Sequence, residues 1–442
     1  MRNCFVIKTY NEAINYIHGR SKFKKDYSLS IIKKFLHEFN DPQNKLNAIH
    51  VTGTNGKGST VNFLRNIFQR DGYVVGTFTS PYISKFNERI EINGNPISDD
   101  DLLKLVQLIE PVLKRYDQLY KENSLTEFDL VTVIMLIFFA SHENDLDVVI
   151  IEVGIGGRFD STNVINPIIS VITNVSWDHM NILGNTLKDI AWQKVGILKN
   201  NIPLITGKLD DDCVTSIIQR EVMKNNSSWY MLNRDFSVLN RNFYNLSFDF
   251  DGFGSQFKNL RLSMLGSYQF DNAAVALAVY LVFKKINNKN INKKAIFNGL
   301  LNSRWKGRFE LINQQPSIYI DGAHNVPAID KLIDLINDCF SNKRVFILFS
   351  ALIDKNYLTM IKKLNSINNV HLYLTNFSSP YGKRSSISYK DVNNKFDNIF
   401  IKDWKNAYNT IIKFITLDDI FIITGSLYFI SDVRNYFYKS NY

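Results

Sequence analysis

The sequence predicts an α/β protein of two domains. The N-terminal domain is expected to be a parallel-sheet domain with a phosphate-binding loop (P-loop), and the smaller C-terminal domain a Rossmann-like α/β domain. Three observations support this prediction. Short apolar runs alternate with helical patterns along most of the 442 residues. The run 147–153 is almost wholly apolar, as is typical of a central parallel strand. A strand, a glycine-rich turn and a helix follow one another between residues 49 and 70.

Length and composition fit this class. A chain of 442 residues has room for two or three domains, and we place the boundary at residue 300, giving domains 1–300 and 301–442. The residues are 45% hydrophobic and 21% charged, which is ordinary for a globular protein. The net charge of +10 fits a nucleic-acid partner, an anionic small substrate or background composition, since the lysines are spread along the chain. Because no nucleic-acid module is recognisable, we expect no nucleic acid.

Cysteine use and hydropathy predict a cytoplasmic protein. The three cysteines, Cys4, Cys213 and Cys339, lie far apart and match no disulfide or metal spacing. No apolar signal core follows the first residues. The most hydrophobic run, residues 130–140, is much shorter than the roughly 20 residues that a membrane span needs. We therefore expect no membrane partner, and we expect a monomer.

The N-terminal half is predicted to begin with helices and continue as alternating strands and helices. Helical patterns cover parts of 1–47, then 61–70, 99–120 (begun at Ser98), 126–141, 187–198 and 269–284. Strand patterns are an apolar run ending at Val51, then 73–78, an arm at 89–92 with a turn at Asn93-Gly94, 147–153, 168–173 and 202–206. Residues 210–262 look less regular, with short antiparallel strands between 229 and 250.

The C-terminal part repeats the α/β alternation. Its predicted strands are 317–320, 344–349, 370–374 and 420–424, with helices between them. Polar or glycine-containing turns follow these strands, at 321–325, 350–355 and 424–426. No dinucleotide-binding glycine fingerprint is present.

The turn after Val51 is a candidate phosphate-binding loop. Its glycines let backbone N–H groups surround an anion, and the following helix N-terminus adds partial positive charge. Lys57 adds a full charge, and Ser59 or Thr60 can ligate Mg²⁺. Only two residues separate Gly53 from Gly56, so the spacing is nonstandard and a chance glycine-rich turn is the alternative. The candidate nucleotide-binding residues of this loop are Thr54, Asn55, Gly56, Lys57, Gly58, Ser59 and Thr60.

Polar residues follow three further predicted strands. Ser80, Glu152 and His179 come at or just after strand ends, and carboxyl ends of parallel strands share one edge of a sheet. Hydroxyl, carboxylate and imidazole groups together suit one or two Mg²⁺ ions that bridge triphosphate oxygens. Each residue also has a simpler interpretation: a turn cap, a structural ion pair and a satisfied polar side chain, respectively. Lys194, on an otherwise apolar helical face, could be a solvated surface lysine.

Motifs along nearly the whole chain carry a resemblance to a known family. They are residues 50–59, 79–81, 86–90, 152–163, 178–179, 193–197, 269–274, 307–310, 321–325 and 424–427. In this order they resemble the folylpolyglutamate synthase/dihydrofolate synthase family of the Mur ligases, which are ATP-dependent amide-forming enzymes. The resemblance implies an ATPase domain at the N-terminus and a glutamate-binding ligase domain at the C-terminus.

The resemblance implies a two-step reaction. ATP phosphorylates the terminal carboxylate of a tetrahydrofolate, and the amine of L-glutamate attacks the acyl phosphate to give an amide, ADP and phosphate. One alternative is a bifunctional enzyme that also, or mainly, joins glutamate to dihydropteroate. Less favoured alternatives are a cell-wall precursor ligase and a P-loop nucleotide-binding module without ligase chemistry.

The resemblance also implies roles for individual residues. Lys57 and the loop amides hold the β- and γ-phosphates. One Mg²⁺ is held by Ser59 or Thr60 with Ser80 and Glu152, and a second by Glu152 and His179. The family's lysine at the position of Lys194 is carbamylated, which turns a cation into a carboxylate-like metal ligand. The expected catalytic residues are therefore Lys57, Glu152, His179 and Lys194.

Further residues are assigned to substrates by the same resemblance. Asn272, Arg308 and Asp321 match the family's nucleotide contacts. His324 and Ser426 are candidates for binding glutamate, and Arg89 for binding a substrate carboxylate.

Three positions depart from the family pattern. Tyr82 stands where the family commonly has histidine, residues 27–31 replace a Gly-Leu-Glu-Arg-like helix start, and Lys306 stands where proline is common. The first two fall where the pterin end of the substrate is expected. They leave open the choice between dihydropteroate and reduced folates.

Overall fold

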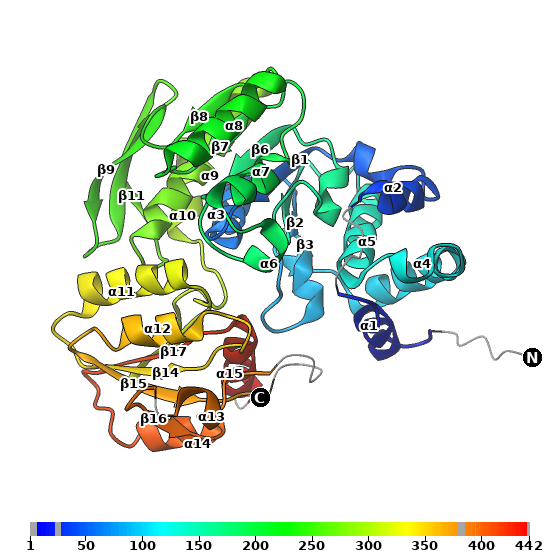
Figure 1. Ribbon diagram of the computed structural model, residues 1–442. Coiled ribbons are helices and arrows are strands. Elements are labelled where there is room, and N and C mark those ends of the chain that lie inside the picture. The colour runs from blue at the N-terminus through cyan, green and yellow to red at the C-terminus, as the bar shows by residue number, and fades with distance from the viewer. Residues whose placement is uncertain (1–6, 23–27, 379–384, 394, 440–442) are drawn as a thin grey trace, which may run out of the picture. The chain divides into compact units, whose positions relative to one another are not determined.

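The computed structural model describes residues 7–22, 28–378, 385–393 and 395–439 (Figure 1). Their contacts form two compact α/β units, so the predicted two-domain α/β class is confirmed. The first comprises Met1–Leu239, Phe250–Lys258 and Asp271–Asn302, and the second Asn240–Asp249, Asn259–Phe270 and Ser303–Tyr442. The single boundary at residue 300 stays a prediction. Cys4, Tyr27 and the start of the predicted N-terminal helical region lie outside the described residues.

The first unit is built on an eight-stranded sheet of order β4-β3-β2-β5-β1-β6-β7-β8. Neighbours from β2 to β8 run parallel, while β3 and β4 form an antiparallel edge. Strand β5 lies between β2 and β1 and is buried at every residue, as its apolar run predicted. The strands are β1 Ala48–Thr52, β2 Val75–Phe78, β3 Ile90–Ile92, β4 Asn95–Pro96, β5 Val148–Glu152, β6 Ile169–Ile172, β7 Leu204–Thr206 and β8 Trp229–Met231.

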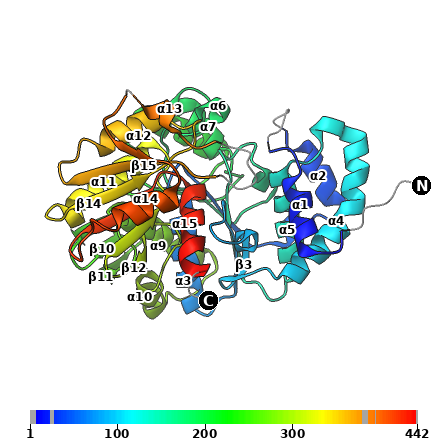
Figure 2. The same cartoon turned by 90° about the horizontal axis from the view of Figure 1, so that it is seen from below.

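Four helices share one apolar core with this sheet (Figure 2). They are α1 Tyr10–His18, α2 Ser30–His37, α4 Asp99–Tyr120 and α5 Glu127–Ser141. Helix α4 has the predicted bounds, and the Ser98 side chain accepts a hydrogen bond from the Asp101 N–H at its start. Thr126 and Asp129 form a capping box at the start of α5, whose side chains are buried on most sides. Three short 3₁₀ helices, η1 Pro42–Lys45, η2 Phe86–Arg89 and η3 Lys121–Asn123, belong to the same region.

The remaining helices of this unit lie between the strands of the parallel sheet or, for the last two, after the strands of a separate small sheet. They are α3 Lys57–Arg70, α6 Met180–Leu183, α7 Leu187–Val195, α8 Asp212–Lys224, α9 Tyr268–Ile286 and α10 Lys293–Leu301, with the 3₁₀ helix η4 Ser161–Val164. Helix α10 packs its backbone against α3. A Cβ on Gly299 would come within 2.7 Å of the Ile67 Cα, so only glycine permits this approach.

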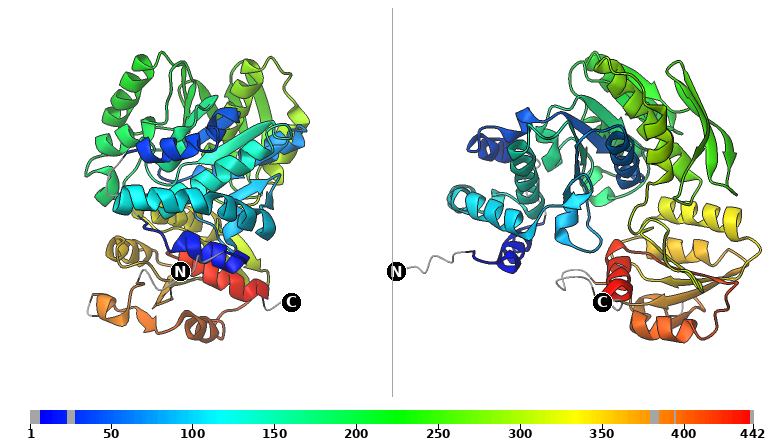
Figure 3. Two further views of the ribbon diagram at one scale, coloured as in Figure 1. Left: turned by 90° about the vertical axis from the view of Figure 1, so that its right-hand side faces the viewer. Right: turned by 180° about the vertical axis from the view of Figure 1, so that it is seen from behind.

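The second unit is built on a six-stranded sheet of order β12-β13-β17-β14-β15-β16. Only β12 runs antiparallel to its neighbour. Helices α11 and α12 cover one face of this sheet, and α14 and α15 cover the other (Figure 3). Successive residues of β14 enter these opposite cores: Val345 and Ile347 join the core of α11 and α12, and Phe346 joins that of α14 and α15. The elements are β12 Glu310–Asn313, β13 Ser317–Asp321, α11 Val326–Phe340, β14 Val345–Phe349, α12 Tyr357–Leu364, β15 Val370–Thr375, α13 Tyr389–Val392, β16 Ile399–Ile401, α14 Trp404–Ile411, β17 Ile420–Thr424 and α15 Leu427–Lys439.

The prediction for residues 210–262 is wrong in two respects. Helix α8 lies within this segment, and strand β8 pairs in parallel with β7 instead of joining an antiparallel group. Strands β9 Phe236–Asn242, β10 Ser247–Gly252 and β11 Ser255–Arg261 form a separate three-stranded sheet. Strands β12 and β16, both at edges of the second sheet, were also not predicted.

Candidate active site

The phosphate loop, residues 53–60, joins β1 to α3. Gly56 has a φ of 83° and precedes the first residue of α3. A Cβ there would lie 2.3 Å from Asn272 Oδ1, and a Cβ on Gly53 would lie 1.8 Å from Thr173 Oγ1. The space beside both glycines is therefore too small for a side chain. Asn272 lies directly against the loop.

The segment after β6 supports this loop through hydrogen bonds. Asn174 Oδ1 accepts from the backbone N–H groups of Thr54 at 3.1 Å and Asn55 at 3.0 Å. Thr54 Oγ1 donates to the Ser176 carbonyl at 3.0 Å, and Thr173 Oγ1 donates to the Asn55 carbonyl at 2.5 Å. Asn174 was not among the predicted site residues. Its position directly after a buried strand was the available signal.

Lys57 and the hydroxyl pair begin α3. Lys57 Nζ donates to the Gly53 carbonyl at 2.9 Å and the Thr54 carbonyl at 3.2 Å, so the ammonium lies over the loop. Ser59 and Thr60 are buried in the first turn, and Thr60 Oγ1 has no hydrogen-bond partner among the described residues. A cation, a helix N-terminus and loop amides at one place suit binding of a phosphate group.

The parallel register aligns the strand ends that precede the other candidate residues. Val51 pairs with Glu152, and Phe78 pairs with Ile151. The Ser80 backbone N–H donates to Glu152 Oε2 at 3.1 Å, which brings these two candidate residues into contact. Glu152 is only 4% exposed, and this hydrogen bond offsets part of the cost of burying its carboxylate.

His179 and Lys194 both lie near Asp178. His179 has a φ of 47° at the start of α6, and its Nε2 is 3.8 Å from Asp178 Oδ2. Lys194 is buried on α7, which excludes the solvated surface alternative. The pKa of Lys194 is lowered to about 7, chiefly by burial and also by the charge of Lys57, while Asp178 opposes the shift.

The loop after Glu152 ties β1 to the end of α7. Thr52 Oγ1 donates to the Gly156 carbonyl at 2.6 Å, and the Arg158 N–H donates to the Gln193 carbonyl at 2.7 Å. Asn163 Nδ2 donates to the Gly196 carbonyl at 3.0 Å. The loop continues from the strand that carries Glu152, so it connects the neighbouring strand β1 to the end of α7, the helix that carries Lys194.

Arg89 ends η2 among aromatic rings. Its guanidinium carbon is 5.2 Å from the ring centre of Tyr82 and 5.6 Å from that of Phe86. These distances allow cation–π attraction, which orients the side chain.

In the second unit, the Asp321 carboxylate is held by two backbone hydrogen bonds. It ends β13 and accepts hydrogen bonds from the N–H groups of Phe309 and Ala323, both at 2.9 Å. Burial raises the pKa of Asp321, against the opposing effects of Arg308 and these two N–H groups. Burial also raises the pKa of Tyr268, and the charge of Asp321 adds to that shift.

The glutamate candidates lie at the same edge of the second sheet. Asp321 pairs with Thr424, which ends β17, and Ser426 follows at the start of α15. His324 Nδ1 is 2.8 Å from the Gly322 carbonyl, so this nitrogen carries the proton of the hydrogen bond. Ser426 is 2% exposed and follows Gly425, whose φ is 111°.

The candidate residues are thus divided between the units. Lys57, Ser80, Glu152, His179, Lys194 and Asn272 belong to the first, and Arg308, Asp321, His324 and Ser426 to the second. The described ranges contain no group of three or more His, Cys, Asp or Glu residues arranged to hold a metal. They also contain no helix that is long and apolar enough to cross a membrane.

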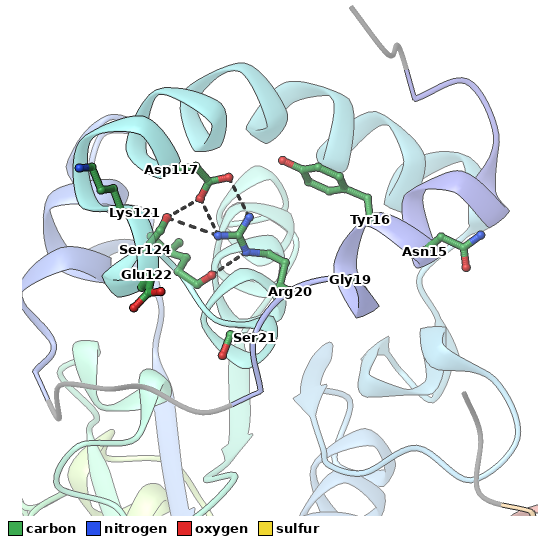
Figure 4. A pocket seen from close by; sticks show the side chains of 10 residues that line it. Asn15, Tyr16, Gly19, Arg20, Ser21, Asp117, Lys121, Glu122 and Ser124 are labelled. Atoms are coloured by element: carbon green, nitrogen blue, oxygen red, sulfur yellow. Dashed lines mark hydrogen bonds and ion pairs between the residues drawn. The ribbon is translucent and has the colours of Figure 1, made fainter. Parts of the chain in front are cut away.

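A cavity of about 490 Å³ lies among the N-terminal helices, and none of the predicted site residues lines it (Figure 4). Arg20 on its wall donates to both Asp117 oxygens, at 3.0 and 2.7 Å, and to Ser124 Oγ at 3.3 Å. Its Nε donates to the Leu125 carbonyl at 2.6 Å. These polar groups satisfy one another, so we assign the cavity no ligand.

A glycine-rich loop between a parallel strand and a helix, with polar residues at neighbouring strand ends, defines the first unit as a P-loop nucleotide-binding domain. Comparison with known proteins places the chain more narrowly. Residues 51–280 match the Mur ligase middle domain, and residues 307–427 match the Mur ligase, glutamate ligase domain. The chain belongs to the Mur ligase family, and within it to the folylpolyglutamate synthases and dihydrofolate synthases.

The similarity extends over almost the whole chain. The sequence is 39% identical to the dihydrofolate synthase/folylpolyglutamate synthase of Bacillus subtilis (strain 168) over 432 residues, covering 96% of this chain and 98% of that protein. It is 35% identical to the folylpolyglutamate synthase of Lacticaseibacillus casei, with coverages of 96% and 98%. A solved FPGS–AMPPCP–folate complex gives a TM-score of 0.85 at 34% identity, covering 97% of this chain and 99% of that chain. The family resemblance is confirmed, and the chain is an ATP-dependent ligase that forms C–N bonds between an acid and an amino acid.

Proposed function

We propose that this ligase joins L-glutamate to the terminal carboxylate of tetrahydrofolate. The observation that carries the proposal is the 39% identity over 96% of the chain to a dihydrofolate synthase/folylpolyglutamate synthase. The alternative of a nucleotide-binding module without ligase chemistry is disfavoured, because residues 307–427 match a glutamate ligase domain. A cytoplasmic location and a monomeric state remain predictions.

The reaction needs ATP and proceeds through an acyl phosphate. A folate carboxylate oxygen attacks the γ-phosphorus and releases ADP. The glutamate amine then attacks the acyl carbon, forms the amide bond and releases phosphate and a proton. Phosphoryl transfer of this kind depends mainly on alignment and on stabilisation of charge.

We assign phosphate binding to the phosphate loop. Lys57 Nζ already lies over the loop, 2.9 Å from the Gly53 carbonyl, and can turn to a phosphate oxygen. The amides of residues 54–60 and the N-terminus of α3 orient the β- and γ-phosphates. Asn272 from α9, and Arg308 and Asp321 from the second unit, are assigned to the remainder of the nucleotide.

The donors at the strand ends fit Mg²⁺. Hydroxyl and carboxylate oxygens are its preferred ligands, and it commonly binds through one or two carboxylates completed by water and substrate phosphates. Ser59, Ser80, Glu152 and His179 would hold one or two ions, and Thr60 is an alternative to Ser59. Bound Mg²⁺ would neutralise charge on the triphosphate oxygens.

Lys194 is proposed to be carbamylated. Carbamylation needs a neutral amine, and burial lowers the pKa of Lys194 to about 7, which makes the neutral form available near neutral pH. The carbamate would act as a further carboxylate-like ligand.

The acceptor and glutamate sites are assigned to three more residues. Arg89 is held over Tyr82 and Phe86 and is proposed to contact a substrate carboxylate. His324 and Ser426 are proposed to bind glutamate.

The test is phosphate release by the purified protein with ATP, Mg²⁺, L-glutamate and tetrahydrofolate, together with mass spectrometry of the folate product. Release should require both glutamate and folate, and the product should gain one glutamyl residue. Dihydropteroate is the second acceptor to assay, because the B. subtilis relative is also a dihydrofolate synthase by name. Failure to release phosphate with either acceptor would contradict the proposal.

A further inference from the structure

Phe309 has a backbone conformation that is unusual for an aromatic residue. Its φ is 44°, in the left-handed region, which bulky side chains rarely adopt. Gly307 has a φ of 67°, but glycine takes such a conformation at little cost. Phe309 therefore carries backbone strain, and such strain persists only where surrounding contacts hold the residue in place.

The ring of Phe309 supplies those contacts. It stacks on Tyr319 with ring centres 4.4 Å apart and planes inclined by 23°, and its centre is 6.0 Å from that of Phe340. Phe309 is 5% exposed and belongs to the core that α11 and α12 share with the second sheet. Burial and stacking of the ring therefore offset the strain in its backbone.

The strained residue stands between the two nucleotide candidates of this unit. Its N–H donates to Asp321 Oδ2 at 2.9 Å. A Cβ on Gly322 would lie 2.8 Å from an Arg308 guanidinium nitrogen, so the Arg308 side chain lies on the Gly322 backbone. The Gly322 N–H in turn donates to the Gly307 carbonyl at 2.9 Å. A change in the path of residues 307–309 would displace both Arg308 and the donor to Asp321.

We propose that Phe309 is a positioning residue for nucleotide binding: its buried ring keeps residues 307–310 in the path that holds Arg308 beside Asp321. The inference rests on the roles proposed above for Arg308 and Asp321. Substitution of a residue that contributed only to the core would lower stability without changing the KM for ATP.

Phe309→Ala and Phe309→Gly separate these two roles. Both remove the ring, but only alanine keeps the steric penalty at positive φ. We expect the KM for ATP to rise about tenfold in Phe309→Ala, the change that strain of this size produces, and to rise less in Phe309→Gly. The proposal is overturned if KM for ATP is unchanged in both variants, or if glycine is the more impaired.

Leu372→Ala is the control, since it removes a buried apolar side chain from the same core on β15, which β17 and β14 separate from β13. It should lower Tm with KM for ATP unchanged, and an increase in KM equal to that of Phe309→Ala would contradict the proposal. Phe309→Leu keeps an apolar anchor and provides a folded variant if the smaller ones do not fold. Its KM for ATP should lie between the wild-type value and the value expected for Phe309→Ala. A KM equal to that of the wild type would count against the proposal. Binding of a fluorescent ATP analogue to the wild type and Phe309→Leu gives the same comparison if the wild type binds ATP but ligates no glutamate. That outcome would remove the proposed function and leave this test intact.

Discussion

Glu152 is the residue on which the proposed metal site depends most. It lies at the end of the central strand and is 4% exposed, and its Oε2 accepts a hydrogen bond from the Ser80 N–H. Glu152→Gln keeps the shape of the side chain and the acceptor for Ser80 but removes the charge. We expect an unchanged Tm and a fall in kcat by about a hundredfold or more, since charge stabilisation dominates such sites. Steady-state kinetics and a thermal melt measure this, and wild-type turnover would remove the two-ion assignment.

Lys194 predicts a dependence on pH. With a folded-state pKa of about 7, against an ordinary value of 10.5, its amine is protonated below pH 7 and cannot be carbamylated there. Activity should therefore fall as pH drops through about 7. Because the unfolded chain keeps this proton up to pH 10.5, the cost of burying Lys194 should diminish as pH rises from 7 to 10.5.

Substitution of Lys194 tests the same assignment directly. Lys194→Ala should lose most of the activity, and short-chain carboxylic acids should restore part of it by filling the place of the carbamate. Lys188→Ala, an exposed lysine at the start of the same helix, is the control and should retain activity. A Lys194→Ala variant that no carboxylic acid rescues would argue for the free amine as the working group.

At the scale of elements, α9 and the end of α3 are joined by a buried ion pair. Lys284 Nζ is 2.8 Å from Asp71 Oδ2, both side chains are 7% exposed, and Tyr280 donates to the same oxygen at 2.8 Å. Lys284→Met would leave a buried carboxylate without its cation, which costs about 3 kcal/mol or more. We expect a lower free energy of unfolding by denaturant titration.

The neighbouring Lys285 gives a control for that prediction. It is exposed, so Lys285→Met should change stability by less than about 0.5 kcal/mol. Adding Asp71→Asn to Lys284→Met removes the second charge and should recover part of the loss. If Lys284→Met and Lys285→Met lower the free energy of unfolding equally, the ion pair between Lys284 and Asp71 contributes little to stability.

Elements with a strong local pattern were predictable from the sequence, and those defined by distant contacts were not. Strand β5 is an almost wholly apolar run, and helix α4 has an apolar pattern of helical period that begins after the capping residue Ser98. Helix α8 was predictable in principle, since Val214, Ile218 and Val222 recur at intervals of four residues after a capping Asp211. Strands β12 and β16 are short and lie at sheet edges, so their patterns are weak.

The candidate site shows the same division. The phosphate loop and the strand-end residues could be located from local motifs. The burial of Lys194, the support of the loop by Asn174 and the positive φ of Phe309 depend on contacts between segments far apart in sequence. No local pattern encodes such contacts.

At the scale of the whole molecule, the residues assigned to the nucleotide belong to both units. Lys57 lies in the first, and Arg308 in the second. If both contact ATP, then ATP with Mg²⁺ should raise the Tm of the wild type, because a ligand that binds only the folded state stabilises it. Lys57→Ala and Arg308→Ala should each reduce that shift, measured by a thermal melt at fixed ATP concentration. A full ATP-induced shift in Arg308→Ala would mean that the first unit binds the nucleotide alone, and the second unit would then contribute only to the acceptor and glutamate.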